Sequence, residues 1–499
     1  MSATLQNPST GSVPTQKPSR ADTPRTGGTA IILYLSLGGL SFAVLQSLVA
    51  PALGTIGEDL GVSTGDASWV LTAYLLSAAV LTPILGRLGD MVGKRRVLII
   101  VLSLLLIGTI VAALAPNLGV LIIGRILQGA AGAVMPLSIG IVRDELPKER
   151  ISVTIGLLSA IFGIGAGVGI VAAGPIVETL SWQWLFWLPA ILVAVALLGA
   201  IFGMKESPVR TPGHLDLLGT GILTVSLVSI LLPISEGQNW GWGDAKTIGL
   251  LALGVIALIA FVFAELRVAE PLIDVRLFRH RGVWTAHVVA LAFGFAMFGT
   301  FILVPTLLQL PPMLGYGFGK SVSEAGIYLL PTVVAMVISG VIAGVIIRSI
   351  GPKIPMVIGG VAVAVAFIIP ALGHSETWQI LVPGVLTGIG IGMALAATSN
   401  AIVESVPAAQ TGEAISANTV LRTIGSSVGT AVIAALISSN VTAQGAPTDE
   451  AFTMGFWVSA GVGVLAIIAA LVAPSLRQRR RDAAAAGVDD IEELAATPS

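Results

Sequence analysis

Two arginines lie inside long apolar stretches of this sequence, where a charged side chain is costly to place. Arg125 lies in the stretch near residues 118–142, and Arg422 lies within residues 412–425. A charge at such a depth costs about 2.5–3.5 kcal/mol to insert into a membrane, so its usual use is to bind a substrate or to move protons. We interpret Arg125 as functional; the alternative is an arginine that bonds backbone carbonyls for packing alone.

Carboxylates, in contrast, are found only at the ends of these stretches. Those nearest are Glu178, Glu236, Glu265, Glu324, Glu404, Glu413 and Asp216. Glu404 or Glu413 could pair with Arg422. A carboxylate in the middle of a membrane would be the natural proton carrier or cation binder. Its absence favours neutral, amphipathic or anionic ligands over strongly cationic ones.

Other chemistry is poorly supported by the residue types present. The chain has no cysteine and only four scattered histidines, so it offers no disulfide, no thiolate metal site and no recognisable metal spacing. No nucleophile–base pair is evident. We therefore expect no enzyme activity, no cofactor, no metal and no nucleic-acid partner.

The elements that hold the arginines are fourteen apolar stretches of about 20 residues, each long enough to cross a ~30 Å hydrocarbon core as a helix. The composition agrees, at 55% hydrophobic and 11% charged residues with a mean hydropathy of +0.94. The fold class is therefore an all-α polytopic membrane protein. The stretches lie near residues 30–52, 68–86, 97–115, 118–142, 153–177, 184–204, 217–235, 246–266, 284–310, 323–348, 354–373, 377–400, 414–438 and 454–474.

The distribution of basic residues predicts the orientation. With the N-terminus in the cytoplasm, all of the 26 Lys and Arg fall in cytoplasmic links or tails except Lys246, Lys320 and the two arginines inside the stretches. Such a bias places both termini in the cytoplasm. Residues 1–29 are rich in Ser, Thr and Pro and are interpreted as a disordered tail. The longest interior link, near 267–283, is predicted to lie on the inner membrane surface as an amphipathic segment.

A faint internal repeat divides the chain. Residues 86–95 and 344–353 share two glycines and a final basic residue at an offset of 258. The second stretch therefore corresponds to the tenth, which gives two six-helix halves and an inserted pair, as in transporters whose substrate site lies between repeats. The predicted organisation is a tail (1–29), an N-terminal six-helix bundle (30–204), an inserted two-helix linker with a cytoplasmic segment (205–283), a C-terminal six-helix bundle (284–474) and a tail (475–499).

Glycines mark two further features. Gly89 and Gly93 suit a tight turn that needs unusual backbone angles, and Asp90 stands where a carboxylate can meet a helix N-terminus or an arginine. A plain turn that anchors the topology is the alternative. Later in the chain, two pairs of glycines have the four-residue spacing that lets helix backbones approach closely. These pairs are Gly163/Gly167 and Gly165/Gly169.

The turn resembles the cytoplasmic loop motif of the major facilitator superfamily, Gly-x-Leu-x-Asp-x-x-Gly-Arg-Lys. The matching positions are Gly86, Leu88, Asp90, Gly93, Lys94 and Arg95. The resemblance implies that the aspartate helps latch the two halves, with the N-terminal end of the thirteenth span as its partner through the helix dipole. Gly86, Asp90, Gly93, Lys94 and Arg95 thus become candidate gating residues, and Asp90 and Arg95 would govern the switch between states.

Two more segments resemble the same family. Arg125, Gln128 and Gly129 match its fourth-helix motif, Arg-x-x-Gln-Gly, which is tied to proton coupling, and 412–425 is similar to the thirteenth helix of its fourteen-span drug:proton antiporters. The sequence departs from that subgroup at Gln46, where an aspartate is typical. The glycine run of 163–174 is similar to its antiporter motif but has Ile170 and Ala173 at two defining positions.

The resemblance implies an exporter of drug- or antibiotic-like small molecules that works by alternating access, coupled to protons, as a monomer among lipids of a bacterial plasma membrane. The alternatives are a proton-independent or lipid or metabolite carrier and a non-transporting membrane sensor. The first, fourth, ninth and twelfth spans are expected to line a cavity. Its candidate substrate or coupling residues are Gln46, Arg125, Gln128, Met297, Gln309, Asn400 and Arg422.

Overall fold

A computed structural model describes residues 28–207, 209–210, 213–268, 270–442, 446–475 and 478 of the chain. The described residues form helices and connecting turns, with a single isolated bridge between Val441 and Pro447. Nearly all of the two predicted tails lies outside the described residues.

Fourteen helices in the described part of the chain are long and apolar enough to cross a membrane, which confirms the predicted fold class. The long helices are α1 (Gly28–Leu48), α4 (Trp69–Val92), α5 (Lys94–Ala113), α6 (Leu118–Gln128) continued by α7 (Val134–Glu145), α8 (Lys148–Thr179), α9 (Trp184–Phe202), α10 (Leu217–Trp240), α11 (Ala245–Glu265), α12 (Arg281–Gln309), α13 (Val322–Ile350), α14 (Lys353–Leu372), α15 (Trp378–Val403), α16 (Thr411–Ser439) and α17 (Asp449–Val472). The short ones are η1 (Ala50–Ala52), α2 (Leu53–Asp59), α3 (Thr64–Ala67), η2 (Gly129–Ala133), η3 (Val275–Arg279), η4 (Pro312–Leu314) and η5 (Ala408–Gln410).

The turns at the ends of the second and tenth spans are alike in backbone as well as in sequence. Gly93 joins α4 to α5 with φ +126°, and Gly351 follows α13, before α14, with φ +84°. Side chains with a Cβ rarely adopt such angles, so glycine is required at both turns. The equivalent conformations support the repeat inferred from the sequence.

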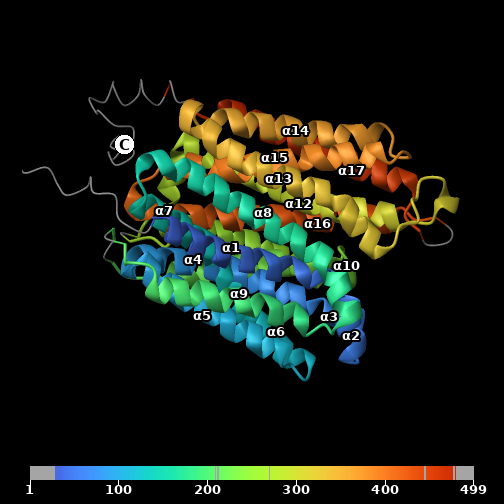
Figure 1. The fold of residues 1–499 in the computed structure, drawn as a ribbon, viewed down its shortest axis with the longest axis horizontal. Helices are drawn as coiled ribbons and strands as arrows, with labels where there is room; N and C mark the ends of the chain where they lie inside the picture. The colour runs from blue at the N-terminus through green and yellow to red at the C-terminus, as the bar shows by residue number, and fades with distance from the viewer. Residues whose placement is uncertain are drawn as a thin grey trace, which may run out of the picture.

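The helices pack as two groups that run roughly parallel to one long axis (Figure 1). Helices α1 to α9 are called here the first bundle and α12 to α17 the second bundle. Most of their contacts lie within each bundle, except that α8 packs at least as extensively on α13 as on α1. The bundles meet along two seams, α4 against α16 and α8 against α13. Each seam joins a span near the start of one bundle to a later span of the other, as a two-fold repeat requires.

The inserted pair α10 and α11 packs against itself and against the bundles through α10, which contacts both α4 and α16. The link that follows α11 differs from the prediction. It contains the short turn η3, and Leu272, Ile273 and Leu277 are buried instead of lying on a surface. Leu272 and Ile273 pack with apolar residues of α10, α11 and α16, because these faces leave a gap that the link fills.

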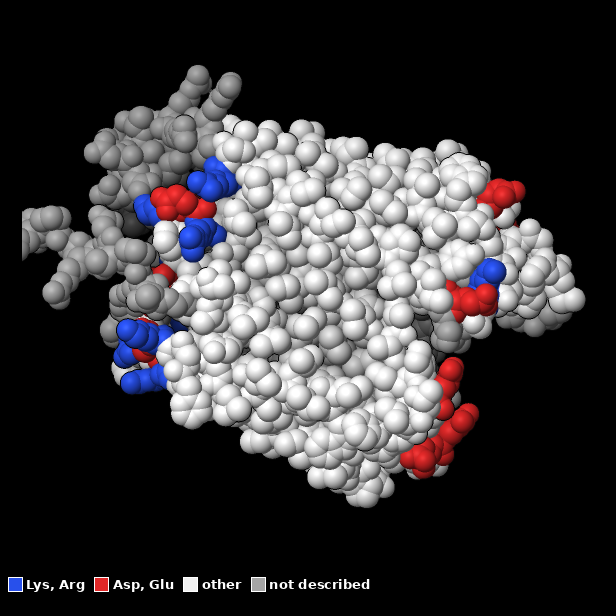
Figure 2. Space-filling model, viewed as in Figure 1, with Lys and Arg blue, Asp and Glu red and all other residues white. Residues whose placement is uncertain are grey.

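Charged side chains gather at the two ends of the molecule and leave a wide uncharged band between them (Figure 2). We call the end that carries Lys94, Arg95, Arg96, Arg348 and Lys353 the basic end, and the other the opposite end. An uncharged band around helices of this length is what a bilayer requires of the surface it surrounds.

Candidate functional site

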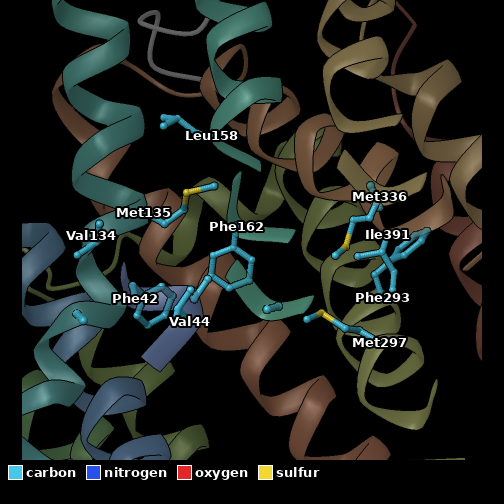
Figure 3. Packing of buried hydrophobic residues seen from close by; sticks show 14 of the residues in the cluster. Phe42, Val44, Val134, Met135, Leu158, Phe162, Phe293, Met297, Met336 and Ile391 are labelled. Atoms are coloured by element: carbon cyan, nitrogen blue, oxygen red, sulfur yellow. The ribbon is translucent and has the colours of Figure 1, made fainter. Parts of the chain in front are cut away.

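A cavity lies at the centre of the molecule between the two bundles, with a volume of about 120 Å³. Side chains of α1, α4, α8, α10, α12 and α16 line it. Its apolar wall includes Phe42, Phe162 and Met297, which Figure 3 shows around the same central space. The centroids of the Phe42 and Phe162 rings are 5.5 Å apart. The cavity therefore offers two neighbouring aromatic rings, tilted by 42° to each other, as an apolar surface.

Arg422 brings a charge into this cavity from α16. Its Cζ atom lies 4.7 Å from the centroid of the Phe162 ring, a cation–π arrangement. Neither Glu404 nor Glu413 pairs with it, so the predicted ion pair is wrong: Glu413 bonds Arg87 instead, near the N-terminal end of α16. Within the described residues Arg422 forms no ion pair.

Arg125 and Gln128 form a sealed cluster and do not line the cavity, which corrects their expected place. Arg125 donates through Nε to the Val70 carbonyl at 2.9 Å and through Nη1 to Gln128 Oε1 at 2.7 Å. Its Cζ lies 4.2 Å from the ring centroid of Tyr74, a cavity residue. Arg125 does not face the cavity because the side of α6 that carries it packs against α4.

Of the other candidates, Gln46 and Met297 line the cavity, whereas Gln309 and Asn400 do not. Gln309 is exposed at the end of α12, where its amide donates to the Pro305 carbonyl at 3.0 Å. Asn400 is buried in α15, where its amide donates to the Ala396 carbonyl at 2.8 Å. No residue of α15, the twelfth span, lines the cavity, because this helix packs between α12, α13 and α14.

Sequence inspection missed a polar stripe on α16. The members of this stripe share one helical face and line the cavity: Thr419, Thr423, Ser426, Ser427 and Thr430. Their spacing of three and four residues was a readable signal, since positions so spaced lie on one side of a helix. Ser235 and Gln238 of the inserted helix α10 also line the cavity, and no sequence pattern pointed to them.

At the basic end, Asp90 joins the two bundles. Its carboxylate accepts hydrogen bonds from the backbone N–H groups of Gly412 at 3.3 Å and Glu413 at 3.0 Å, in the first turn of α16. The contact predicted from the sequence is present, and the positive end of the helix dipole favours it. Lys94 is also buried, with Nζ 3.4 Å from Asp90 and 2.7 Å from Asp144.

A second buried contact lies beside the first. Arg87 of α4 donates to Glu413 of α16 at 3.2 Å, and both side chains are buried. The backbone N–H of Asp274, in the link after α11, donates to the same carboxylate. We call Arg87, Asp90, Lys94 and Glu413 the basic-end cluster. Because the link bonds Glu413, the inserted segment is part of the same junction.

Gly86 packs against the second bundle, whereas Arg95 bonds only within the first. A Cβ at Gly86 would overlap Ser416 and lie 2.9 Å from the Gly412 carbonyl, so glycine is needed for α4 to approach α16. Arg95 instead bonds within the first bundle, donating to the carbonyls of Ala200 at 2.9 Å and Ile201 at 2.5 Å. These contacts satisfy carbonyls at the end of α9 and do not reach the second bundle, contrary to the switch role expected for Arg95.

The glycine run of α8 packs on two sides. Added Cβ atoms at Gly163 and Gly167 would meet Met336 and Val333 of α13, while those at Gly165 and Gly169 would meet α1. The two predicted pairs thus serve two different neighbours, one in each bundle. This agrees with the interpretation of these glycines as packing residues.

Comparison with known proteins finds a matching family and several relatives of the chain. The model of the Major Facilitator Superfamily matches residues 35–319 and 289–496. The tetracenomycin C resistance and export protein of Streptomyces glaucescens is 27% identical over 419 residues, which are 82% of this chain and 76% of that protein. Multidrug resistance protein 3 of Bacillus subtilis is 28% identical over 437 residues, which are 87% of this chain and 83% of that protein.

A similar fold is found among solved structures. The proton:xylose symporter XylE has a TM-score of 0.64 at 14% identity, covering 91% of this chain and 97% of the XylE chain. Two helical bundles around a central cavity define a multi-pass membrane transporter rather than an enzyme. The chain belongs to the major facilitator superfamily, among relatives named for multidrug resistance and antibiotic export.

Proposed function

We propose that this protein exports drug- or antibiotic-like small molecules by alternating access, with residues 30–204 and 284–474 rocking about the central cavity. The observation that best supports the proposal is the cavity between the two bundles. At the basic end, the bundles are joined by a small set of polar contacts, which can break and re-form. Breaking these contacts would open the cavity toward the basic end, and remaking them would close it.

The basic end is proposed to face the cytoplasm of a bacterium, with both termini on that side of the plasma membrane. The concentration of Lys and Arg at this end supports the orientation. In the described state the basic end is then closed by the basic-end cluster. Gating is assigned to Gly86, Asp90, Gly93 and Lys94, with Arg87 and Glu413 added from their contacts.

We place the exit path for the substrate toward the opposite end, where a second pocket lies. A second pocket of about 500 Å³ lies between α10 and α16, and Gln238 lines both it and the central cavity. The cavity itself is smaller than the ~300–1,000 Å³ of sites that hold drug-sized ligands. The bundles must therefore part further at the opposite end to release a substrate.

Proton coupling is part of the proposal, although the carboxylate typical of such exporters is replaced by Gln46 in the cavity. Glu236 of α10 is buried and is the sequence neighbour of Ser235, which lines the cavity, but Glu236 itself does not line it and is not assigned as the proton carrier. It accepts hydrogen bonds from Ser68 at 3.3 Å, Thr72 at 3.2 Å and Asn239 at 2.9 Å. A proton-independent carrier is the second candidate, because no acid lines the described cavity.

The test is an accumulation and susceptibility screen in a bacterial host that lacks its own pumps. Expression should lower the intracellular level of at least one drug-like compound, and Asp90→Asn should restore that level without reducing the amount of protein in the membrane. Proteoliposomes with and without a pH gradient then separate the two candidates. Equal compound levels with and without the protein across a broad panel would contradict export.

A further inference from the structure

Arginine is the one charged residue type among the described residues that line the central cavity. Arg422 lines the cavity, and Arg125 lies directly behind the Tyr74 ring that lines it. No Asp or Glu is among the described residues that line the cavity, and neither arginine forms an ion pair there. Positive charge in a dry interior is unfavourable unless it is paired. The missing partner can be supplied by a ligand.

Two buried donors beside this charge also lack partners. The Tyr74 hydroxyl is buried without a hydrogen bond, and so is Nη2 of Arg125. Buried polar groups in proteins are almost always bonded, so each exception requires an explanation. Tyr74 is only 2% exposed and belongs to the cavity wall. Its hydroxyl is buried in the described state, so it can reach an acceptor in the cavity only when the bundles part further around a ligand.

The remaining wall is suited to the body of such a ligand. The guanidinium of Arg422 lies over the Phe162 ring, which leaves its N–H groups for a bidentate acceptor. Phe42 and Met297 also line the cavity, and Figure 3 shows them on either side of Phe162. The hydroxyl stripe of α16 adds neutral donors next to the charge.

We propose that the central cavity selects substrates that carry an acidic group, such as a carboxylate or sulfonate, on an aromatic body, with Arg422 as the residue that binds the acid. Tyr74 contributes its hydroxyl to the same group, and Arg125 adds charge from behind the ring. This inference rests on the proposed export function, whose substrate class it names. A cationic drug meets two guanidiniums and no carboxylate, so it is the poorest ligand for this cavity.

The test compares three probes that share one aromatic body. Pyrenebutyrate is an anion, its primary amide is neutral, and pyrenebutylamine is a cation. Their binding to the full-length protein in nanodiscs is followed by fluorescence anisotropy. We expect the anion to bind about tenfold more tightly than the amide, the factor for one charge-assisted hydrogen bond, and the amine to bind most weakly.

Variants of Arg422 test whether this residue causes the preference for the anion over the amide. Arg422→Gln should remove the difference between anion and amide, and Arg422→Lys should keep part of it because the charge remains. Arg279→Gln, at an exposed arginine in the link after α11, should leave it unchanged. Equal affinity for anion and amide, tighter binding of the amine, or a preference that survives Arg422→Gln would overturn the inference.

A second measurement separates this inference from the function on which it rests. The same host cells are loaded with acidic, neutral and cationic fluorescent compounds, and efflux is measured with and without the protein. Efflux that favours the acids and falls with Arg422→Gln supports both proposals. Efflux of cations in preference to acids overturns the anion proposal and leaves export standing. No efflux of any compound, with anion binding intact in nanodiscs, overturns export alone.

Discussion

The two seams between the bundles occupy equivalent places in the repeat but are built from different chemistry. At the α4–α16 seam, Asp90 and Arg87 of one bundle bond the first turn of α16 in the other. Glycine lets the backbones approach at both seams, at Gly86 in the first and at Gly156 in the α8–α13 seam, where a Cβ would lie 2.7 Å from the Gly340 carbonyl; the α8–α13 seam lacks the polar contacts. No ion pair joins α8 to α13 in the described chain.

The difference follows from one position of the repeat. At the offset of 258, Asp90 corresponds to Arg348, which is exposed at the end of α13. Only the first copy therefore has a carboxylate that can meet a helix N-terminus. A polar seam can open and be satisfied by water, whereas a glycine seam depends on close backbone packing. We interpret α4–α16 as the latch of the protein and α8–α13 as its pivot.

The largest effect is expected at the buried pair of the latch. Glu413→Met leaves Arg87 buried without its carboxylate, and breaking a buried ion pair in this way costs about 3–5 kcal/mol. Transport should be lost. The double variant Arg87→Met/Glu413→Met removes both charges and should regain much of the thermal stability lost by either single variant, measured in a double-mutant cycle. Strictly additive losses would show that the two residues act separately.

Stability and efflux should depend on side-chain size at the α8–α13 pivot and not on charge there. Gly156→Leu inserts a side chain where α13 backbone lies, and overpacking of this kind typically costs about 1–3 kcal/mol. We expect a lower unfolding temperature and slower efflux. Gly249→Leu on α11 is the matched control, because nothing lies within 4 Å of a Cβ there. Similar losses in both variants would mean that the α8–α13 contact has no special role.

Neutralising the aspartate of the latch should have a smaller effect on stability than on transport. Asp90→Asn keeps the shape and leaves Lys94 paired with Asp144 at 2.7 Å, but it removes the attraction of the charge to the α16 N-terminus, worth about 0.3–2 kcal/mol. Efflux should slow severalfold while membrane insertion stays intact. Asp244→Asn, at the opposite end, caps α11 in a similar way and is the control. Undiminished efflux by Asp90→Asn would remove this residue from the gate.

The smallest change is expected where the inserted pair attaches beside the α4–α16 seam. Glu236→Gln preserves an oxygen that accepts from Ser68 and Thr72, so stability should fall by no more than about 0.5–1.5 kcal/mol, the net worth of one hydrogen bond. Efflux should remain within a few-fold of the parent. Complete loss of transport driven by a pH gradient, with insertion unchanged, would instead show that Glu236 carries the proton.

Hydropathy was sufficient for the fold class, because span length depends on the membrane alone, whereas the orientation that the charge bias indicates stays a prediction. The contact of Asp90 with α16 was expected from the family motif that the turn resembles. Of the two glycines expected to take unusual backbone angles, Gly93 does so with φ +126°, whereas Gly89 lies inside α4 without a positive φ. In contrast, the surroundings of Arg125 could not be predicted from the sequence. Depth in the membrane can be read from the sequence, but the direction in which a helix turns a side chain depends on its neighbours.

Pairings between distant segments were the least predictable part of the site. Nothing local to Glu413 shows that it bonds Arg87 and the backbone of Asp274 rather than Arg422. The burial of the link after α11 depends on a gap formed by three helices from different parts of the chain. The α16 stripe was visible as a spacing, but its spacing alone does not separate a cavity wall from a helix contact.

A reversible cross-link across the latch tests alternating access most directly. The Ser416 Cβ lies 3.0 Å from the place of a Cβ at Gly86, near the ~3.5–4.5 Å that a disulfide spans, and the chain has no cysteine of its own. In Gly86→Cys/Ser416→Cys, oxidation should abolish efflux, and reduction should restore it to the level of the Gly86→Cys single variant, which carries the same added Cβ beside the Gly412 carbonyl. The efflux of each single variant should not respond to oxidation. Full efflux from completely cross-linked protein would contradict the account.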